Sequence, residues 1–231
     1  MLSWDDYWKQ YSISKAERWM ISERDRRLQE WISSLGEGTK RVAEVGCGYG
    51  SNIRLIQRTR QDVECHALDF SEVSCERIRE EIPHVHRADC QDTGLPEGSF
   101  DFVYSSGLME HFRDEGPFLR EMYRLVRPGG LMATFVPARW SLWQLYQFLW
   151  KIAKRDGWIH GYEKAYTRSF LREVVEKEGW VVEDEFGFDP FSVNGFLMKL
   201  MNVSFQPVWR VSPLSAGYTE ICVLTRKPSA G

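Results

Sequence analysis

The segment that most constrains the fold of this chain is "RVAEVGCGYGSN", which runs from Arg41 to Asn52. An apolar run of strand character leads directly into Gly46, Gly48 and Gly50, and a helical pattern follows. Glycine tolerates positive φ and lets a ligand approach the backbone closely, at the expense of conformational entropy on folding. A strand, a glycine-rich turn and a helix, in that order, can hold a nucleotide-like ligand at the helix N-terminus. The segment therefore predicts a ligand-binding loop.

Strand and helix patterns alternate beyond this loop, which favours βαβ units in an α/β fold with a doubly wound, mostly parallel sheet. We expect strands at 41–46, 63–70, 84–89, 100–106 and 131–136, with helices at 51–60, 72–81 and 114–126. The tail adds a helix at 168–178 and strands at 181–188 and 217–228. The tetrapeptide "RPGG" (127–130) is expected to form a turn before the fifth strand.

Composition and charge exclude several classes of protein. With 43% hydrophobic and 27% charged residues among 231, the chain has the profile of a soluble globular domain. Its net charge of −3 gives no reason to expect nucleic acid as a partner. The five cysteines form no CxxC pair, so we expect a reduced, cytoplasmic chain with neither disulfides nor a bound metal. The sequence shows no signal peptide and no apolar stretch of about 20 residues.

Two acidic residues at the ends of expected strands bear on the identity of the ligand. Asp69 lies nineteen residues after Gly50, where a carboxylate can accept hydrogen bonds from both hydroxyls of a ribose. Asp89 ends the third expected strand, where it can accept from the amine of an adenine. Taken alone, these acids suit either a nicotinamide cofactor or S-adenosylmethionine. The glycine spacing is G-x-G-x-G, however, and not the G-x-G-x-x-G of a dinucleotide fingerprint.

Four motifs decide between these cofactors by their order. "EVGCGYG", "ALDFS", "RADCQDTGLPEGSFDFVYSSGLMEHF" and "MYRLVRPGG" together resemble the class I S-adenosylmethionine-dependent methyltransferases, especially the group that acts on small molecules and lipids. The resemblance is close over 41–136 and looser in the C-terminal strand pair. It implies a Rossmann-like sheet of seven strands, with the last strand antiparallel between the fifth and sixth. It also implies S-adenosyl-L-methionine as cofactor, with S-adenosyl-L-homocysteine as product.

The resemblance further implies a role for each matching residue. Glu44 matches the acid that orients the methionine ammonium group, and Asp69 matches the acid that binds the ribose. Asp89 matches the acceptor for the adenine amine, with Asp92 as an alternative, and the backbone amide of Cys90 matches the donor to the adenine ring. The other implied cofactor-binding residues surround the glycine loop, the adenine and the end of the fourth strand: Gly46, Gly48, Gly50, Asn52, Phe70, Ser105 and Ser106.

The predicted catalytic residue is His111, in "GLMEHF" just past the fourth strand. Methyl transfer from a sulfonium needs aligned reactants and, for a hydroxyl acceptor, removal of one proton. Imidazole can take up that proton near neutral pH. The alternative for His111 is a structural role in shaping the loop. Glu110 and His160 are weaker candidates for the base, since Glu110 can be packed away and His160 can be a solvated loop residue.

Segments outside the expected sheet bear on the methyl acceptor. We interpret the chain as a single domain with a helical cap at 1–36, a cofactor-binding core at 41–136, and lid insertions at 138–166 and 189–212. The stretch 140–158 carries four tryptophans on a helical pattern with a narrow polar stripe. Such a segment can line a hydrophobic acceptor pocket, contact a membrane surface or a second copy of the chain, or serve only in packing.

The sequence thus predicts methyl transfer from S-adenosylmethionine to a small-molecule, glycan or lipid-like acceptor, with oxygen as the favoured atom. One alternative is a NAD-dependent oxidoreductase, which the glycine spacing and the lack of a Tyr-x-x-x-Lys pair disfavour. Another is a catalytically inactive S-adenosylmethionine-binding partner subunit. Methylation of nucleic acid is disfavoured because "SSGL" stands where an (Asn/Asp)-Pro-Pro-(Tyr/Phe) motif would lie.

Overall fold

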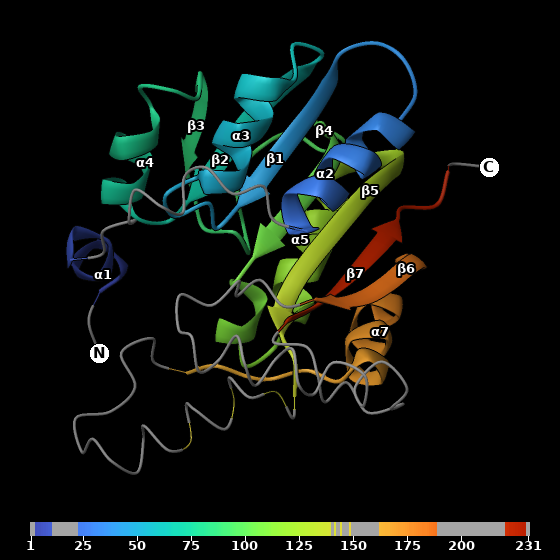
Figure 1. Cartoon of the computed structure of the whole chain (residues 1–231). Coiled ribbons are helices and arrows are strands. Elements are labelled where there is room, and N and C mark those ends of the chain that lie inside the picture. Colours follow the sequence, from blue (N-terminus) through green and yellow to red (C-terminus); the bar gives the residue numbers. More distant parts are fainter. Residues whose placement is uncertain are drawn as a thin grey trace, which may run out of the picture.

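The computed structural model describes residues 3–10, 23–139, 141, 144, 148, 162–188 and 220–229. Within these residues, seven strands form one sheet in the order β3-β2-β1-β4-β5-β7-β6 (Figure 1). The strands are β1 (Lys40–Val45), β2 (Val63–Asp69), β3 (His84–Arg87), β4 (Phe100–Ser106), β5 (Val126–Pro137), β6 (Val181–Phe188) and β7 (Glu220–Arg226). Strands β1 to β5 pair in parallel, and β7 runs antiparallel between β5 and β6. The predicted fold class and the place of the last strand are confirmed.

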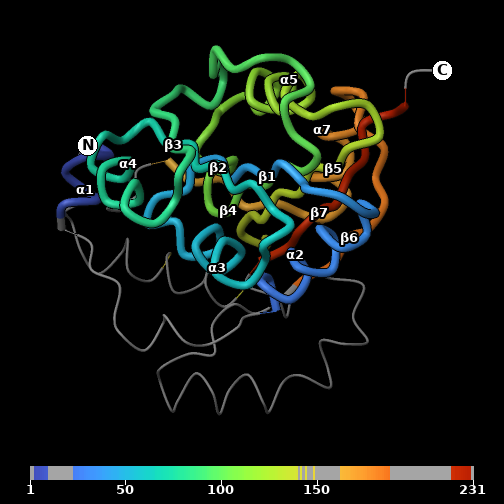
Figure 2. Tube along the Cα trace, turned by 90° about the horizontal axis from the view of Figure 1, so that it is seen from above, coloured from blue at the N-terminus to red at the C-terminus, as the bar shows by residue number. Residues whose placement is uncertain are grey.

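Helices cover both faces of the sheet (Figure 2). They are α1 (Trp4–Gln10), α2 (Glu23–Ser34), α3 (Ser51–Thr59), α4 (Glu72–Ile78), α5 (Gly116–Leu125) and α7 (Arg168–Lys177), with a 3-10 turn η2 (Met109–His111). Leu28 of α2 and Ile53 of α3 pack on Phe102 from one side, while Phe118 of α5 packs with Val103 on the other. Because successive strand residues face opposite sides, a sheet covered on both faces has almost wholly buried central strands.

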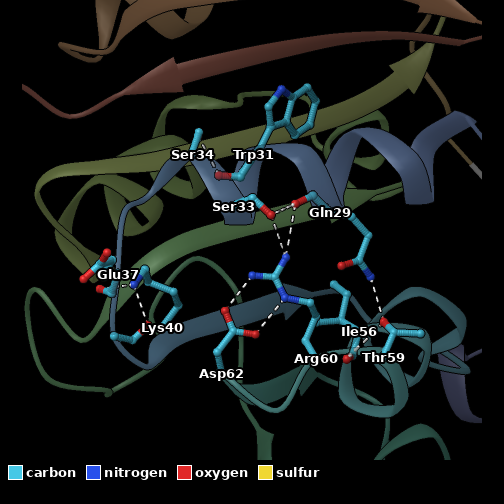
Figure 3. Close-up of polar contacts among 11 residues, drawn as sticks. Gln29, Trp31, Ser33, Ser34, Glu37, Lys40, Ile56, Thr59, Arg60 and Asp62 are labelled. Atoms are coloured by element: carbon cyan, nitrogen blue, oxygen red, sulfur yellow. Dashed lines mark hydrogen bonds and ion pairs between the residues drawn. The ribbon is translucent and has the colours of Figure 1, made fainter.

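Polar contacts hold α2 against the loop that follows α3 (Figure 3). The Arg60 guanidinium donates to both carboxylate oxygens of Asp62, at 2.8 and 2.6 Å, and to the Ser33 hydroxyl at 2.8 Å. Gln29 donates to the Thr59 hydroxyl at 2.9 Å. The hydrogen bonds from Arg60 lower the pKa of Asp62 to about 2. Exposed pairs of this kind contribute about 1 kcal/mol at most, so the apolar face of α2 carries most of its attachment.

The predicted "RPGG" turn lies inside a strand. β5 begins at Val126 and not at 131, as the apolar run suggested. Residues 127–130 stand opposite the single residue Asp101 of β4 and form a bulge. A Cβ atom on Gly130 would lie 2.8 Å from the carbonyl oxygen of Asp101, so only glycine fits. The predicted boundary was wrong because the bulge depends on pairing with β4, which local periodicity does not show.

The two helices of the predicted N-terminal cap have different neighbours. α1 lies against α4: the Ser71 hydroxyl donates to the Asp5 carboxylate at 2.5 Å, and Arg77 donates to the carbonyl oxygen of Trp8 at 2.6 Å. α2 instead buries its apolar face in the core of the sheet. Residues 11–22 lie outside the described residues, so a cap formed by all of 1–36 stays a prediction.

The first predicted insertion leaves and returns at one point, the carboxyl end of β5. Ala138 forms a parallel bridge with Tyr166, whose amide donates to the Pro137 carbonyl at 2.9 Å. The Tyr166 ring is fully buried, and its hydroxyl donates to the Glu115 carboxylate at 2.8 Å. Most of 140–161, including His160, and all of 189–212 lie outside the described residues. In the part of the chain that is described, no helix has the length and apolarity that crossing a bilayer requires.

Candidate cofactor-binding site

A cavity of about 290 Å³ opens at the carboxyl ends of β1, β2, β3 and β4. It is lined by residues at or just beyond the ends of these strands, by the last residue of η2 and the residue after it, and by two tryptophans of α1, Trp4 and Trp8. After β1 the chain builds the sheet outward through β2 and β3 and then returns to β4 on the other side. The strand-end cavity therefore lies at the topological switch point, where α/β sheets bind their ligands.

The glycine loop passes from β1 to α3 with its backbone in the left-handed region. Gly48 has φ +51°, and its amide donates to the Asp69 carboxylate at 2.8 Å. A Cβ atom on Gly48 would lie 2.5 Å from the Trp8 ring. Gly50 has φ +64°, and a Cβ atom there would lie 1.9 Å from the side chain of Ile78. Gly48 is thus needed where α1 meets the loop, and Gly50 where α4 packs behind it.

Asp69 lies in the wall of the strand-end cavity and is only 8% exposed. One carboxylate oxygen accepts from the Gly48 amide and the other from the Ser71 amide, both at 2.8 Å. Burial raises the pKa of Asp69, and these two hydrogen bonds oppose that rise. The Ser71 side chain caps α4 by accepting from the Ser74 amide, so Asp69 is not needed as the cap. Each carboxylate oxygen keeps a second lone pair, which suits the hydroxyls of a ribose.

Glu44 is not among the described residues that line the cavity. Its carboxylate accepts from the Ile53 amide at 3.1 Å and from the Asn52 side chain at 3.2 Å, which joins β1 to the first turn of α3. Burial raises the pKa of Glu44 to about 7. Glu44 and Asn52 therefore lie behind the glycine loop, and the cofactor role implied for them stays a prediction.

The adenine side of the predicted site is brought together in the cavity wall. Phe70, Asp89 and Cys90 all line the cavity, and Phe70 is 62% exposed. Asp89 is exposed and accepts from the Gln91 amide at 2.9 Å. Asp92 does not belong to the described lining, so position favours Asp89 of these two acids. Burial raises the pKa of the Cys90 thiol to about 12, which leaves the thiol protonated at neutral pH.

The end of β4 differs from the prediction in which residues it presents. The Ser105 hydroxyl is buried against the Thr134 hydroxyl at 3.0 Å, and Ser106 is also outside the described lining. Gly107 and Leu108, the next two residues, line the cavity instead. Sequence reasoning missed these two together with Phe112, Gln91 and Trp4, whereas the aromatic N-terminal helix with Trp8 was expected to close over the cofactor. For Gly107 and Leu108 the available signal was their place one and two residues beyond the end of β4, which does not select particular side chains.

His111 lies at the end of η2 and lines the cavity. Its Nδ1 atom is 2.9 Å from the carbonyl oxygen of Tyr162. A carbonyl can only accept, so in the neutral ring Nδ1 carries the hydrogen and Nε2 keeps a lone pair. The Trp4 ring meets the imidazole edge-on at 5.1 Å. The neighbouring Glu110 is 5% exposed, and burial holds its pKa well above the ordinary range, in keeping with the prediction that it can be packed away.

A family model described as a methyltransferase domain matches residues 43–134, which include the second half of β1, the glycine loop, β2 to β4 and most of the cavity wall. Residues 43–134 therefore form a methyltransferase domain of the class I S-adenosylmethionine-dependent kind. The cofactor of this family is S-adenosylmethionine, and the cavity fits it. Its wall brings together a buried carboxylate, that of Asp69, and an exposed aromatic side chain, that of Phe70.

Individual relatives are distant. A probable S-adenosylmethionine-dependent methyltransferase of Mycolicibacterium smegmatis is 28% identical over 149 residues, which cover 63% of this chain and 54% of the relative. A malonyl-[acyl-carrier protein] O-methyltransferase of Halorhodospira halophila is 30% identical over 118 residues, which cover 48% and 40% of the two chains. The chain therefore spans about half of the length of these relatives. A solved S-adenosylmethionine-dependent methyltransferase from Archaeoglobus fulgidus aligns with a TM-score of 0.62 at 19% identity, over 88% of this chain and 93% of the other, which shows the shared fold.

Proposed function

We propose that this methyltransferase moves the methyl group of S-adenosylmethionine to a small-molecule, glycan or lipid-like acceptor, with oxygen as the favoured atom. The observation that carries the proposal is a single cavity at the switch point whose wall holds both the buried Asp69 and the imidazole of His111. A malonyl-[acyl-carrier protein] O-methyltransferase among the relatives supports oxygen, although the chain spans only 40% of that protein.

In this proposal the cofactor is held mainly by the first three strand ends. Asp69 accepts from the ribose hydroxyls, Phe70 lies beside the adenine, and Asp89 with the Cys90 amide binds the adenine edge. The bound cofactor supplies a methyl group on a positively charged sulfur. When that methyl group transfers, the sulfur becomes a neutral thioether, so the leaving group needs no proton. The methionine ammonium would stabilise the ionised form of Glu44, because a nearby cation offsets the burial that raises its pKa.

The acceptor side requires a proton acceptor and a surface that excludes water. His111 donates from Nδ1 to the Tyr162 carbonyl, so Nε2 is free to accept the proton of a hydroxyl as the methyl group transfers. Trp4, Trp8 and Leu108 give this side an apolar surface, which suits a hydrophobic acceptor and keeps water from the sulfonium. We also propose that the insertion 138–166 contributes to the acceptor site, because its two ends meet at the carboxyl end of β5 and its Tyr162 carbonyl contacts His111.

Calorimetric titration tests the cofactor assignment before any acceptor is known. S-adenosylmethionine and S-adenosylhomocysteine should bind saturably, NAD should not bind, and Asp69→Ala should lose the binding. Asp62→Ala serves as the matched control, because Asp62 is an exposed acid just before the start of β2, at the opposite end of that strand from Asp69. Binding of NAD in place of the adenosyl ligands would contradict the proposal.

Methyl transfer then separates an enzyme from an inactive binding subunit. Acceptors with hydroxyl, amine and carboxylate groups on lipid, glycan and aromatic frames should be screened with methyl-labelled cofactor. Transfer to a hydroxyl or carboxylate oxygen supports the proposal, and loss of that transfer in His111→Ala places the histidine in the acceptor step. Tight cofactor binding without transfer to any acceptor class favours the inactive subunit.

A further inference from the structure

Three of the five histidines in the chain gather on the two outermost parallel strands. His66 lies on β2, and His84 and His86 lie on the edge strand β3. The parallel register sets His66 beside His84, and Leu68 beside His86. Alternate residues of a strand share a face, so Glu64 lies on the same face as these imidazoles. None of these four polar side chains belongs to the described lining of the strand-end cavity.

The side chains of this group are in direct contact. The ring of His66 is buried, with Nε2 2.8 Å from a Glu64 carboxylate oxygen and Nδ1 3.0 Å from Nε2 of His86. The rings of His66 and His84 stack with their centres 4.5 Å apart. Phe100 of β4 closes the inner side by meeting the His66 ring edge-on at 5.0 Å. His84 is exposed and Glu64 is half-buried, so the group is open on its outer side.

We propose that Glu64, His66 and His84 form a binding site for a borderline divalent transition metal such as Zn²⁺. One ligand atom from each residue lies within 4.8 Å of the other two. Zinc–ligand bonds of roughly 2.0–2.2 Å place neighbouring ligand atoms about 3.3 Å apart, so closure needs shifts of about 1.5 Å. The exposed His84 and the half-buried Glu64 can supply these shifts by side-chain rotation. Two imidazoles and one carboxylate are a donor set that selects such metals over Mg²⁺ or Ca²⁺.

The contacts of His66 also fit the role of a metal-binding histidine whose ring is held in one orientation. The metal would replace the hydrogen between Nε2 of His66 and the Glu64 carboxylate. The Nδ1–H group would then donate to His86, which orients the ring as outer-shell partners of metal-bound histidines do. A metal in this place would link the four-residue edge strand β3 to β2. The cysteine spacing predicts no metal site, and the sequence does not show the histidine group because its members meet only through the strand register.

One neighbouring group opposes the metal. The Arg41 guanidinium donates to the same Glu64 oxygen at 3.0 Å and lies over the Phe100 ring. The positive charge of Arg41 repels a metal cation. Arg41 and the metal would therefore each bind a different oxygen of the Glu64 carboxylate. Arg41→Gln should therefore tighten metal binding, whereas a merely structural histidine cluster would show no such gain.

Calorimetric titration of the full chain with Zn²⁺, in a buffer that does not chelate the metal, tests the site independently of the proposed enzymatic function. One ion should bind per chain, and His84→Ala and Glu64→Gln should weaken the affinity at least tenfold. His111 lies in a different part of the structure, so His111→Ala should bind Zn²⁺ with the affinity of the wild type. His84 is exposed, so its removal should leave the fold intact, which circular dichroism checks. Absence of saturable binding, or unchanged affinity in His84→Ala, would overturn the proposal.

A spectroscopic probe excludes the cysteines as the source of binding. Co²⁺ should bind with the weak visible bands of nitrogen and oxygen ligands, and these bands should disappear in His84→Ala. A strong thiolate-to-cobalt charge-transfer band would place the metal on cysteine and would also overturn the proposal. The intensity of the visible bands reports the number of ligands and so tests whether Glu64 takes part.

Discussion

The two sides of the strand-end cavity are built in different ways. The side at β1, β2 and β3 takes Gly46, Asp69 and Asp89 from positions at, or within two residues of, the ends of parallel strands. The opposite side takes Trp4 from the N-terminal helix and His111 from η2, and it fixes His111 through a carbonyl 51 residues further along the chain. Local strand-end geometry places the first set, whereas long-range packing places the second. Substitutions on the first side should therefore change cofactor affinity, and those on the second should change the acceptor step.

Asp69→Ala should have the largest effect on the cofactor side. The variant loses two hydrogen bonds from ribose hydroxyls to a charged group, each worth roughly 1.5–3 kcal/mol, so affinity should fall on the order of 10³-fold. Titration with S-adenosylhomocysteine measures this loss. Asp69→Asn keeps an amide oxygen as an acceptor and should retain part of the affinity. Unchanged affinity in Asp69→Ala would show that the carboxylate does not bind the ribose. Its role would then be limited to the hydrogen bonds with the Gly48 and Ser71 amides.

His111→Ala tests the acceptor side. Loss of a general base should lower kcat roughly 10²- to 10³-fold, while affinity for S-adenosylhomocysteine should change only a few-fold. The pH dependence of kcat distinguishes a base from a positioning residue, because only removal of the base abolishes the rise in kcat with pH. If His111→Gln restores most of kcat and keeps the wild-type pH profile, the imidazole positions Trp4 and the 162–166 segment instead.

The same contrast explains what could be predicted from the sequence. The glycine loop and Asp69 follow from a strand, a turn and a helix that are adjacent in the chain, so spacing alone located them. The contact of Trp8 with Gly48 could not be predicted, because it joins α1 to a loop about 40 residues away and helical periodicity does not show such contacts. The bulge at 127–130 and the histidine group on β2 and β3 depend on strand register in the same way.

Glu44→Gln should produce a smaller, pH-dependent effect on stability. Glu44 has a folded pKa of about 7, raised by burial from an ordinary value of 4.5. Its contribution to stability is therefore fully present below about pH 4.5 and is lost as the pH rises through 7, since ionisation in the buried site is unfavourable. The stability of the wild type relative to Glu44→Gln should fall by on the order of 2 to 3 kcal/mol between pH 4 and pH 8. Urea denaturation of both chains at each pH measures this difference. A flat difference across the range would show that folding does not raise the pKa of Glu44.

Gly48→Ala should have the smallest global effect and most directly tests the boundary between the two sides. Gly94 is the matched control, because its φ of +68° also disfavours alanine but nothing lies within 4 Å of the Cβ position. Gly94→Ala should therefore lose only the conformational term of about 1 kcal/mol. Gly48→Ala carries the same term and also pushes the Trp8 ring away from the loop. We expect the additional change as a red shift of tryptophan fluorescence and faster proteolysis within α1.

A second substitution separates backbone strain from the contact with Trp8. Trp8→Ala in the Gly48→Ala background should remove the additional loss of stability and leave only the conformational term. Cofactor affinity in the single Gly48→Ala variant then shows whether α1 belongs to the binding site. A tenfold loss of cofactor affinity would show that α1 contributes to the cofactor side, because the displaced Trp8 ring forms part of the cavity wall. Equal behaviour of Gly48→Ala and Gly94→Ala in fluorescence and proteolysis would show that α1 does not pack on the loop in solution. The strand ends alone would then form the wall of the cofactor site.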